Sequence, residues 1–130
     1  MILRHVALAC SSEKNSDRFY KDLLRLEKLE PRSLPISLSK AIFNVDSPLI
    51  MINYHNEEVH FEIFITANSK RGVNPIAHVC IEIDNLETFL RKCDDLKVEV
   101  SRVPRGDRIL TFIRDFDGNL FEIKHRPSNE

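Results

Sequence analysis

The stretch HFEIFI, at residues 60–65, places one glutamate, Glu62, inside a run of apolar residues that favours a β-strand. A second stretch, LFEIKH at residues 120–125, repeats this arrangement with Glu122. In a strand, each glutamate faces one side and its two apolar neighbours face the other. A carboxylate in an apolar strand is costly to bury without a partner, and this chain carries that arrangement twice.

A histidine-bearing strand and a helix precede the first of these stretches. Residues 2–9, ILRHVALA, predict a strand in which His5 faces away from the larger apolar side chains. Ser12 or Ser16 can cap the helix that follows, which carries aromatic and leucine residues at helical spacing. Residues 48–65 then predict a β-hairpin that ends in HFEIFI.

The second half of the chain repeats this order. Residues 75–83, PIAHVCIEI, predict a strand that carries His78, and Asp84 or Asn85 can cap a helix that extends to residue 96. Three strands follow, and the turn DFDGN joins the last two. These strands are KVEVSRV (97–103), RILTFIRD (108–115) and NLFEIKH (119–125).

Each half is therefore predicted to be a βαβββ module, and the fold class is α+β. We expect a single domain over residues 1–130, with the first module at 1–67, the second at 74–126 and a polar connection between them. The histidine-to-glutamate spacing is 57 residues in the first module and 44 in the second. The 13 extra residues fit the region 31–48, which is β-compatible but irregular.

The charge balance limits the classes of partner. The chain has 130 residues, with 19 basic and 20 acidic side chains, and neither sign forms a block. Nucleic acids and anionic membranes are therefore not expected partners, whereas a small molecule is. The N-terminus lacks a stretch long and apolar enough for a signal peptide or a membrane span, so we expect a cytoplasmic protein. The three cysteines have no CxxC spacing, which favours reduced, mostly buried thiols.

Four polar residues occupy matching places in the two predicted modules: His5 and Glu62 in the first, His78 and Glu122 in the second. Because strand side chains alternate, all four face the side opposite the helix layer. A divalent metal would satisfy two imidazoles and two carboxylates at once. This ligand set suits zinc or nickel, and also manganese, iron or cobalt.

Each of these residues also has a simpler interpretation. A single strand histidine is commonly a core or surface residue, and a single strand glutamate can face solvent. The recurrence in both modules favours the metal site over these alternatives. His60 shares the predicted face of Glu62 and is a substitute ligand, a substrate contact or a solvated residue at a strand end. His55, at a predicted turn, and His125, on the opposite face from Glu122, are assigned no role.

Several stretches together resemble the vicinal oxygen chelate superfamily, also called the glyoxalase/bleomycin resistance/dioxygenase family. The resemblance covers about residues 3–125 and is loosest at 31–50. Its most specific parts are FYKDLL and the turn that leads into the second glutamate. The stretches are HVALA…SDRFYKDLLRLEKLE, HFEIFI, AHVCIEIDNLETFLRKC and FIRDFDGNLFEIKH.

This resemblance implies two tandem βαβββ modules that form a curved, cup-shaped mixed sheet around a metal, with helices outside. His5, Glu62, His78 and Glu122 match the four metal-ligand positions of the glyoxalase I-like branch. The implied activity is that of a lactoylglutathione lyase-like enzyme, which chelates two adjacent substrate oxygens and works through an enediolate-type intermediate. Glu62 or Glu122 would transfer the proton, and a homodimer is implied.

Other functions within the family remain alternatives. Bleomycin resistance proteins bind a drug without a metal or catalysis, and epimerases and dioxygenases use related sites. The chain also departs from the family pattern, since Phe116 replaces the proline of DPDGN and Arg25 replaces the glycine of LLG. No set of arginine and asparagine residues stands out as a glutathione clamp, so the glutathione substrate does not transfer with the metal ligands.

Overall fold

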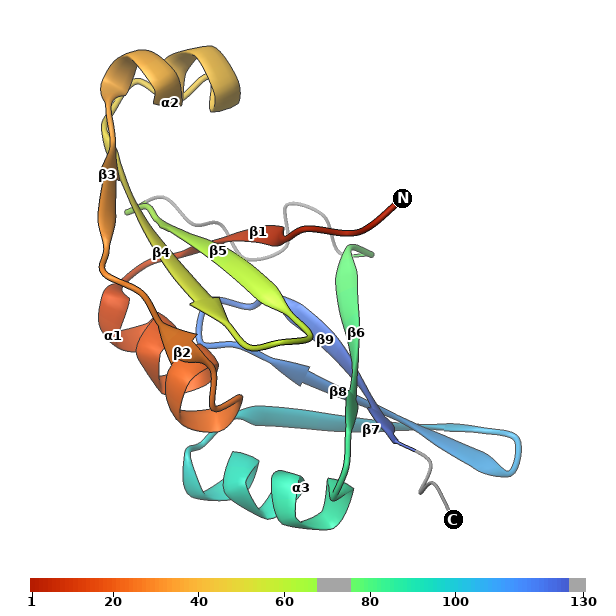
Figure 1. Ribbon diagram of the computed structural model, residues 1–130. Coiled ribbons are helices and arrows are strands. Elements are labelled where there is room, and N and C mark those ends of the chain that lie inside the picture. The colour runs from red at the N-terminus through yellow and green to blue at the C-terminus, as the bar shows by residue number, and fades with distance from the viewer. Residues whose placement is uncertain (68–75, 127–130) are drawn as a thin grey trace. The chain divides into compact units, whose positions relative to one another are not determined.

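The computed structural model describes residues 1–67 and 76–126, and divides the chain into two compact units, Met1–Ser69 and Lys70–Glu130. Each unit contains one open mixed sheet and at least one helix (Figure 1). The α+β class and the two βαβββ modules predicted from the sequence are confirmed. Most of the predicted connection at 66–75 lies outside the described residues.

The first unit has a mixed sheet in the order β1-β5-β4-β2, and β3 also pairs with β4. Strand β1 runs parallel to β5, and the remaining pairs are antiparallel. Strand β1 begins at Val6, so His5 precedes the strand that was predicted over residues 2–9. The elements are β1 (Val6–Cys10), α1 (Glu13–Ser16), η1 (Asp17–Leu23), β2 (Glu27–Lys28), β3 (Arg32–Leu34), α2 (Ile36–Phe43), β4 (Leu49–His55) and β5 (His60–Ile65).

The first helix packs its aromatic side chains on the sheet. Ser12 caps α1 by accepting a hydrogen bond from the backbone N–H of Asn15 at 3.1 Å, and the helix continues as the π-helical segment η1. The Tyr20 ring centroid lies 5.5 Å from that of Tyr54 and 5.4 Å from that of Phe61. All three rings are fully or almost fully buried, so this face of the sheet carries the core of the unit.

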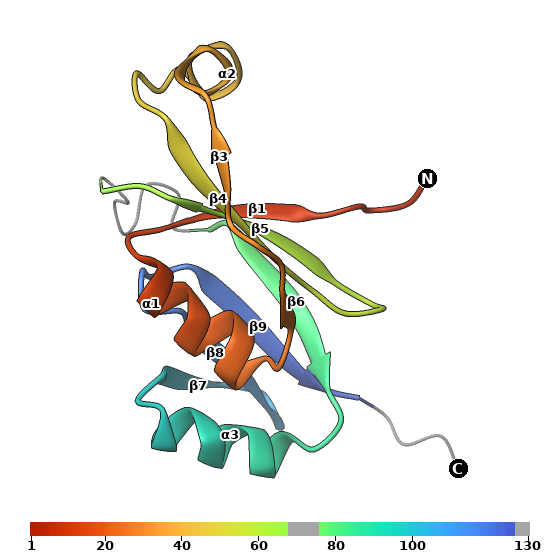
Figure 2. The same cartoon turned by 60° about the vertical axis from the view of Figure 1, so that its left-hand side comes forward.

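The expectation of β-compatible structure between residues 36 and 45 was wrong, because residues 36–43 form the helix α2. Pro35, with its fixed φ, precedes the helix, and Asn44 ends it in the left-handed conformation at φ 57°. Its apolar residues follow no clear helical period, which concealed the helix in the sequence. Figures 1 and 2 both show α2 at the far end of β3 and β4, inside the region predicted to hold the 13 extra residues.

The second unit has a four-stranded sheet in the order β6-β9-β8-β7, with β6 parallel to β9. Helix α3 is amphipathic and begins after Asn85, which accepts a hydrogen bond from the backbone N–H of Thr88 at 3.0 Å. Its buried residues are Phe89 and Cys93, and the helix lies beside β7 (Figure 2). The elements are β6 (His78–Ile83), α3 (Leu86–Asp95), β7 (Glu99–Arg105), β8 (Arg108–Arg114) and β9 (Leu120–His125).

The turn between β8 and β9 depends on one carboxylate. Asp115 Oδ1 accepts hydrogen bonds from the backbone N–H groups of Asp117 and Asn119, and its Oδ2 accepts one from the Asn119 side chain. Gly118 adopts φ 90°, which other residues rarely tolerate. The predicted turn chemistry of DFDGN is therefore confirmed, and the turn leads directly into the strand of Glu122.

Candidate functional site

In the first unit, the parallel pairing of β1 and β5 brings His5 to Glu62. Ala7 lies opposite Glu62 in the register, so His5 lies two residues before that pair. His5 Nδ1 is 3.2 Å from Glu62 Oε2. The Glu62 side chain is only 20 % exposed, whereas that of His5 is 45 % exposed. The carboxylate is therefore held in the sheet while the imidazole remains accessible.

The second unit contains the matching pair. Cys80 lies opposite Glu122, and His78 Nε2 is 3.9 Å from Glu122 Oε2. The other ring nitrogen, Nδ1, lies 2.8 Å from the backbone carbonyl oxygen of Ile76. Because a carbonyl can only accept, Nδ1 is the donor, and in the neutral ring Nε2 is then the nitrogen that keeps a lone pair for a metal. A backbone partner on the second nitrogen is the usual arrangement for a metal-ligating histidine.

Both pairs lie on the sheet face opposite the helix of their unit. Phe61 and Ile63 flank Glu62, and Phe121 and Ile123 flank Glu122; all four apolar residues are at most 3 % exposed. In both units the glutamate pairs with the residue two positions after the histidine. The predicted alternation of faces is therefore confirmed within each unit.

The donor atoms fit a divalent metal, because each pair combines an imidazole nitrogen with a half-buried carboxylate. Each pair by itself provides two ligands. In residues 1–67 and 76–126, no three His, Cys, Asp or Glu side chains come together as a metal site.

The surroundings of the two pairs differ. In the first unit, Asn53 lies opposite Glu62, and His60 Nε2 is 2.7 Å from Asn53 Oδ1. In the second unit, Phe112 lies opposite Glu122 and Leu120 takes the place of His60. The Phe112 ring makes an edge-on contact with His78 at 6.4 Å between centroids. At these two positions the first pair thus has polar neighbours and the second has apolar ones.

The structure also shows where the other histidines considered in the sequence lie. His60 shares the face of Glu62, as predicted, and its ring centroid lies 6.0 Å from that of His5. His55 ends β4 and does not lie in a turn; it pairs with His60 across the strands. His125 lies 3.0 Å from the carbonyl oxygen of Asp84 through Nε2. Asn53 was not predicted, because only the pairing register shows that it lies opposite Glu62.

The three cysteines are free thiols, as predicted, and two of them are buried. Burial raises the pKa of the Cys93 thiol to about 11. Cys80 is exposed and lies opposite Glu122; partial burial, followed by the charge of Glu122, raises the pKa of its thiol above the usual value. Neither thiol is therefore an activated nucleophile at neutral pH.

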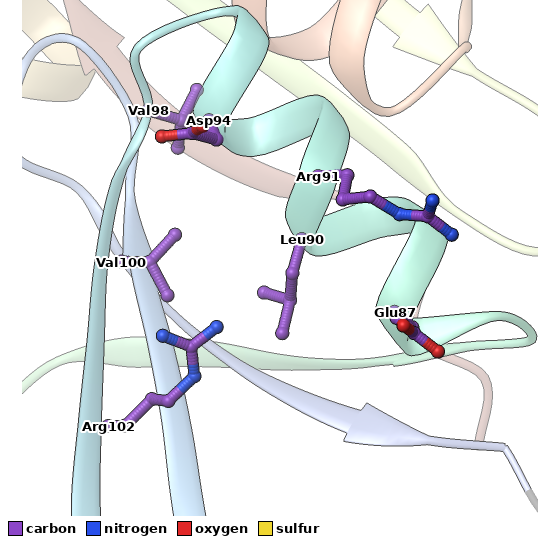
Figure 3. A pocket seen from close by; sticks show the side chains of 7 residues that line it. All are labelled: Glu87, Leu90, Arg91, Asp94, Val98, Val100 and Arg102. Atoms are coloured by element: carbon purple, nitrogen blue, oxygen red, sulfur yellow. The ribbon is translucent and has the colours of Figure 1, made fainter.

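A separate pocket of about 510 Å³ lies between α3 and β7 in the second unit (Figure 3). It lies on the helix side of the sheet, because the lining residue Val100 pairs with Ile113, which in turn pairs with buried Phe121. Glu122 faces the other side. Glu87, Leu90, Arg91, Asp94, Val98, Val100 and Arg102 line the pocket. It is therefore not the site of the histidine–glutamate pair.

The chain belongs to the Glyoxalase/Bleomycin resistance protein/Dioxygenase superfamily, whose family model matches residues 2–123. This match includes all four residues of the two histidine–glutamate pairs. No curated protein matches the chain by sequence.

Solved structures share the fold at low sequence identity. A glyoxalase family protein from Enterococcus faecalis superimposes with a TM-score of 0.72 at 21 % identity, over 94 % of this chain and 95 % of that chain. The fosfomycin resistance protein FosX from Listeria monocytogenes gives a TM-score of 0.72 at 15 % identity, over 98 % and 94 % of the two chains. A variant of that FosX was solved with Mn(II) and 1S,2S-dihydroxypropylphosphonic acid. It gives a TM-score of 0.67 at 18 % identity, over 95 % of this chain and 90 % of that chain.

That FosX structure contains a divalent metal and a small molecule. In the described part of this chain, no helix has the length and apolar character needed to cross a membrane.

Proposed function

We propose that this protein is a metal-dependent, glyoxalase I-like lyase or isomerase that acts on a small substrate with two adjacent oxygens. His5, Glu62, His78 and Glu122 would hold the metal, with zinc or nickel preferred over manganese, iron or cobalt. The observation that carries the proposal is the same histidine–glutamate pair at the same strand register in both units. Family membership supports it.

The bound metal would supply a Lewis acid that polarises the two substrate oxygens. The residues of the chain have separate tasks. His78 is oriented by the carbonyl of Ile76, so its Nε2 is available as a fixed nitrogen donor. Glu62 or Glu122 takes a proton from the substrate carbon and returns it to the adjacent carbon. Both side chains are about one-fifth exposed, which limits competing solvent.

Metal content of the purified protein is the first test. We expect one divalent ion for each set of four ligands, and we expect the Glu62→Ala, Glu122→Ala double variant to lose it. A matched control is the Glu30→Ala, Glu57→Ala double variant, because both of these glutamates are exposed and lie outside the pairs. Elemental analysis after dialysis measures the result. Absence of metal from the wild type, or equal content in the two double variants, would contradict the proposal.

Activity is tested with hemithioacetals formed from an α-ketoaldehyde and a series of thiols, of which glutathione is one. We expect the metal-loaded wild type to isomerise at least one of them, and each single glutamate variant to lose most of that rate. Binding of metal and ligand without turnover would instead favour a small-molecule binding protein, an epimerase or a dioxygenase of the same superfamily. Assays of racemisation and of oxygen consumption separate these alternatives.

We include a homodimer in the proposal. Each sheet ends in strands that pair on one side only within that sheet, such as β7, and a second copy is one way to cover such edges. Light scattering after size-exclusion chromatography should give twice the mass of one chain. A monomer at micromolar concentration, with and without metal, would contradict this part.

A further inference from the structure

The two histidine–glutamate pairs are equivalent in register but not in their neighbours. In the first unit, the strand position two residues before Glu62 carries His60, and the position across from Glu62 carries Asn53. The corresponding positions around Glu122 carry Leu120 and Phe112. At these two positions, the first pair thus has hydrogen-bonding neighbours and the second has apolar ones.

Asn53 determines the orientation and the tautomer of the His60 ring. Asn53 is only 9 % exposed, and its Oδ1 lies 2.7 Å from His60 Nε2. An amide oxygen can only accept, so His60 donates through Nε2–H, and in the neutral ring Nδ1 has a free lone pair. The bond both orients the ring and selects the tautomer that accepts a hydrogen bond.

The ring is also placed next to the first metal pair. Its centroid lies 6.0 Å from that of His5 and 5.9 Å from that of His55. His55 Nε2 in turn lies 3.7 Å from Glu27 Oε2, on the side away from His5. His60 is therefore the histidine of this row that adjoins the His5–Glu62 pair without belonging to it.

We propose that His60 is a substrate-positioning residue, which accepts a hydrogen bond from a hydroxyl group of the metal-chelating ligand. This inference rests on the proposed function and narrows its substrate class. The ligand would be a hydroxy acid or hydroxycarbonyl compound, in which one of the two chelating oxygens is a hydroxyl.

His60 itself is not a metal ligand in this proposal. Within the described residues, it forms no group of three metal-binding side chains with its neighbours. Its Nε2 is already engaged with Asn53. A variant that lacks the ring should therefore keep the metal and lose only the preference for a hydroxyl.

A pair of probe ligands tests this. Glycolate and methoxyacetate offer the same two chelating oxygens, but only glycolate has a hydroxyl that can donate. Calorimetric titration of the Mn(II)-loaded protein with each ligand gives the affinity ratio. We expect His60→Leu, which installs the residue found at the second pair, to lower the glycolate-to-methoxyacetate ratio by about three- to tenfold, the worth of one hydrogen bond.

Two further variants serve as controls. His55→Leu removes the neighbouring histidine and should leave the ratio unchanged. His60→Gln keeps an acceptor at this position and should recover part of the preference. Mn(II) affinity, measured separately by electron paramagnetic resonance, should change less than about twofold in all three variants, which also shows that each one is folded.

The outcomes separate the two proposals. An unchanged ratio in His60→Leu, with Mn(II) still bound, overturns the positioning role and leaves the metal site intact. A tenfold or larger loss of Mn(II) affinity in His60→Leu overturns it in favour of a ligand role. A wild type that binds no divalent metal overturns the proposed function and this inference together.

Discussion

The two units of this protein share the same strand register but bury different side chains at equivalent positions. Tyr54 in the first unit and Ile113 in the second lie at equivalent positions, opposite the buried Phe61 and Phe121. The Tyr54 hydroxyl donates to Asp17 Oδ1 at 2.7 Å and lies 2.8 Å from Ser16 Oγ. The second unit places the aliphatic Ile113 there instead.

This difference shows which features the histidine–glutamate arrangement requires. A polar network and an apolar contact both support the strand next to the glutamate. The parallel pairing of the first and last strands and the buried phenylalanine before the glutamate occur in both units. We therefore infer that these two features, rather than the rest of the core, position each pair.

Removal of the phenylalanines should have the largest effect. Phe61 is 2 % exposed and Phe121 is fully buried, so Phe61→Ala and Phe121→Ala should each lower the free energy of unfolding by about 3–5 kcal/mol. Urea denaturation monitored by circular dichroism measures this. A loss below 1 kcal/mol in either variant would show that the two units do not depend equally on this residue.

Removal of one histidine–glutamate pair should have the second-largest effect. His5→Ala with Glu62→Ala, and His78→Ala with Glu122→Ala, should each weaken metal binding at least about a hundredfold, because two ligands are lost in either case. Competition with a chelator of known affinity gives the value. Loss in only one of the two double variants would mean that a single unit binds the metal.

The polar network of the first unit should contribute less. Tyr54→Phe leaves Asp17 and Ser16 without the hydroxyl, and should cost about 1–3 kcal/mol in the free energy of unfolding. The control is Ile113→Val at the equivalent position, which removes one methylene and should cost about 0.5–1.5 kcal/mol. An equal cost for both variants would show that the network adds nothing to packing.

Tyr54 also gives the first unit a pH dependence. Burial raises the pKa of Tyr54 in the folded state above its usual value of 10.0, so the folded protein holds this proton more tightly than the unfolded chain. Its contribution is therefore fully present below about pH 10 and decreases as the pH rises above that value. Denaturation between pH 8 and 11 should show a smaller alkaline decrease in Tyr54→Phe than in the wild type.

The two helix caps should be equivalent. Ser12 accepts from the backbone of Asn15 at 3.1 Å, and Asn85 accepts from that of Thr88 at 3.0 Å. Ser12→Ala and Asn85→Ala should each cost about 1 kcal/mol in unfolding free energy. Thermal denaturation of the two variants under one set of conditions provides the comparison. Stability equal to that of the wild type would show that the cap is dispensable.

The smallest expected effect is a gain in stability. Arg25 and Lys97 follow the helices of the two units at φ 58° and 61°, a conformation that glycine adopts without steric cost. Arg25→Gly and Lys97→Gly should each stabilise the protein by about 0.5 kcal/mol, after the extra entropy of glycine in the unfolded chain is subtracted. A loss of stability in either variant would show that the replaced side chain contributes contacts of its own.

Several local features could be predicted from the sequence. Alternation around Glu62 and Glu122 indicated their face, because the period of a strand is two and does not depend on distant contacts. Both helices after the histidine strands followed from their spacing and their caps. Helix α2 could not be predicted, because its apolar residues show no single helical face and four of them remain 44–60 % exposed. They are Ile36, Leu38, Ile42 and Phe43.

The sequence by itself determined the duplicated βαβββ order and the residue types of the candidate site, since both depend on short-range periodicity and on repetition. Only the tertiary structure decided that His5 meets Glu62 and His78 meets Glu122, and that Asn53 orients His60. Those contacts join strands 40 or more residues apart in the first two cases and depend on strand register in the third. A shift of one residue would turn every side chain of a strand to the other face, and packing against the core prevents it.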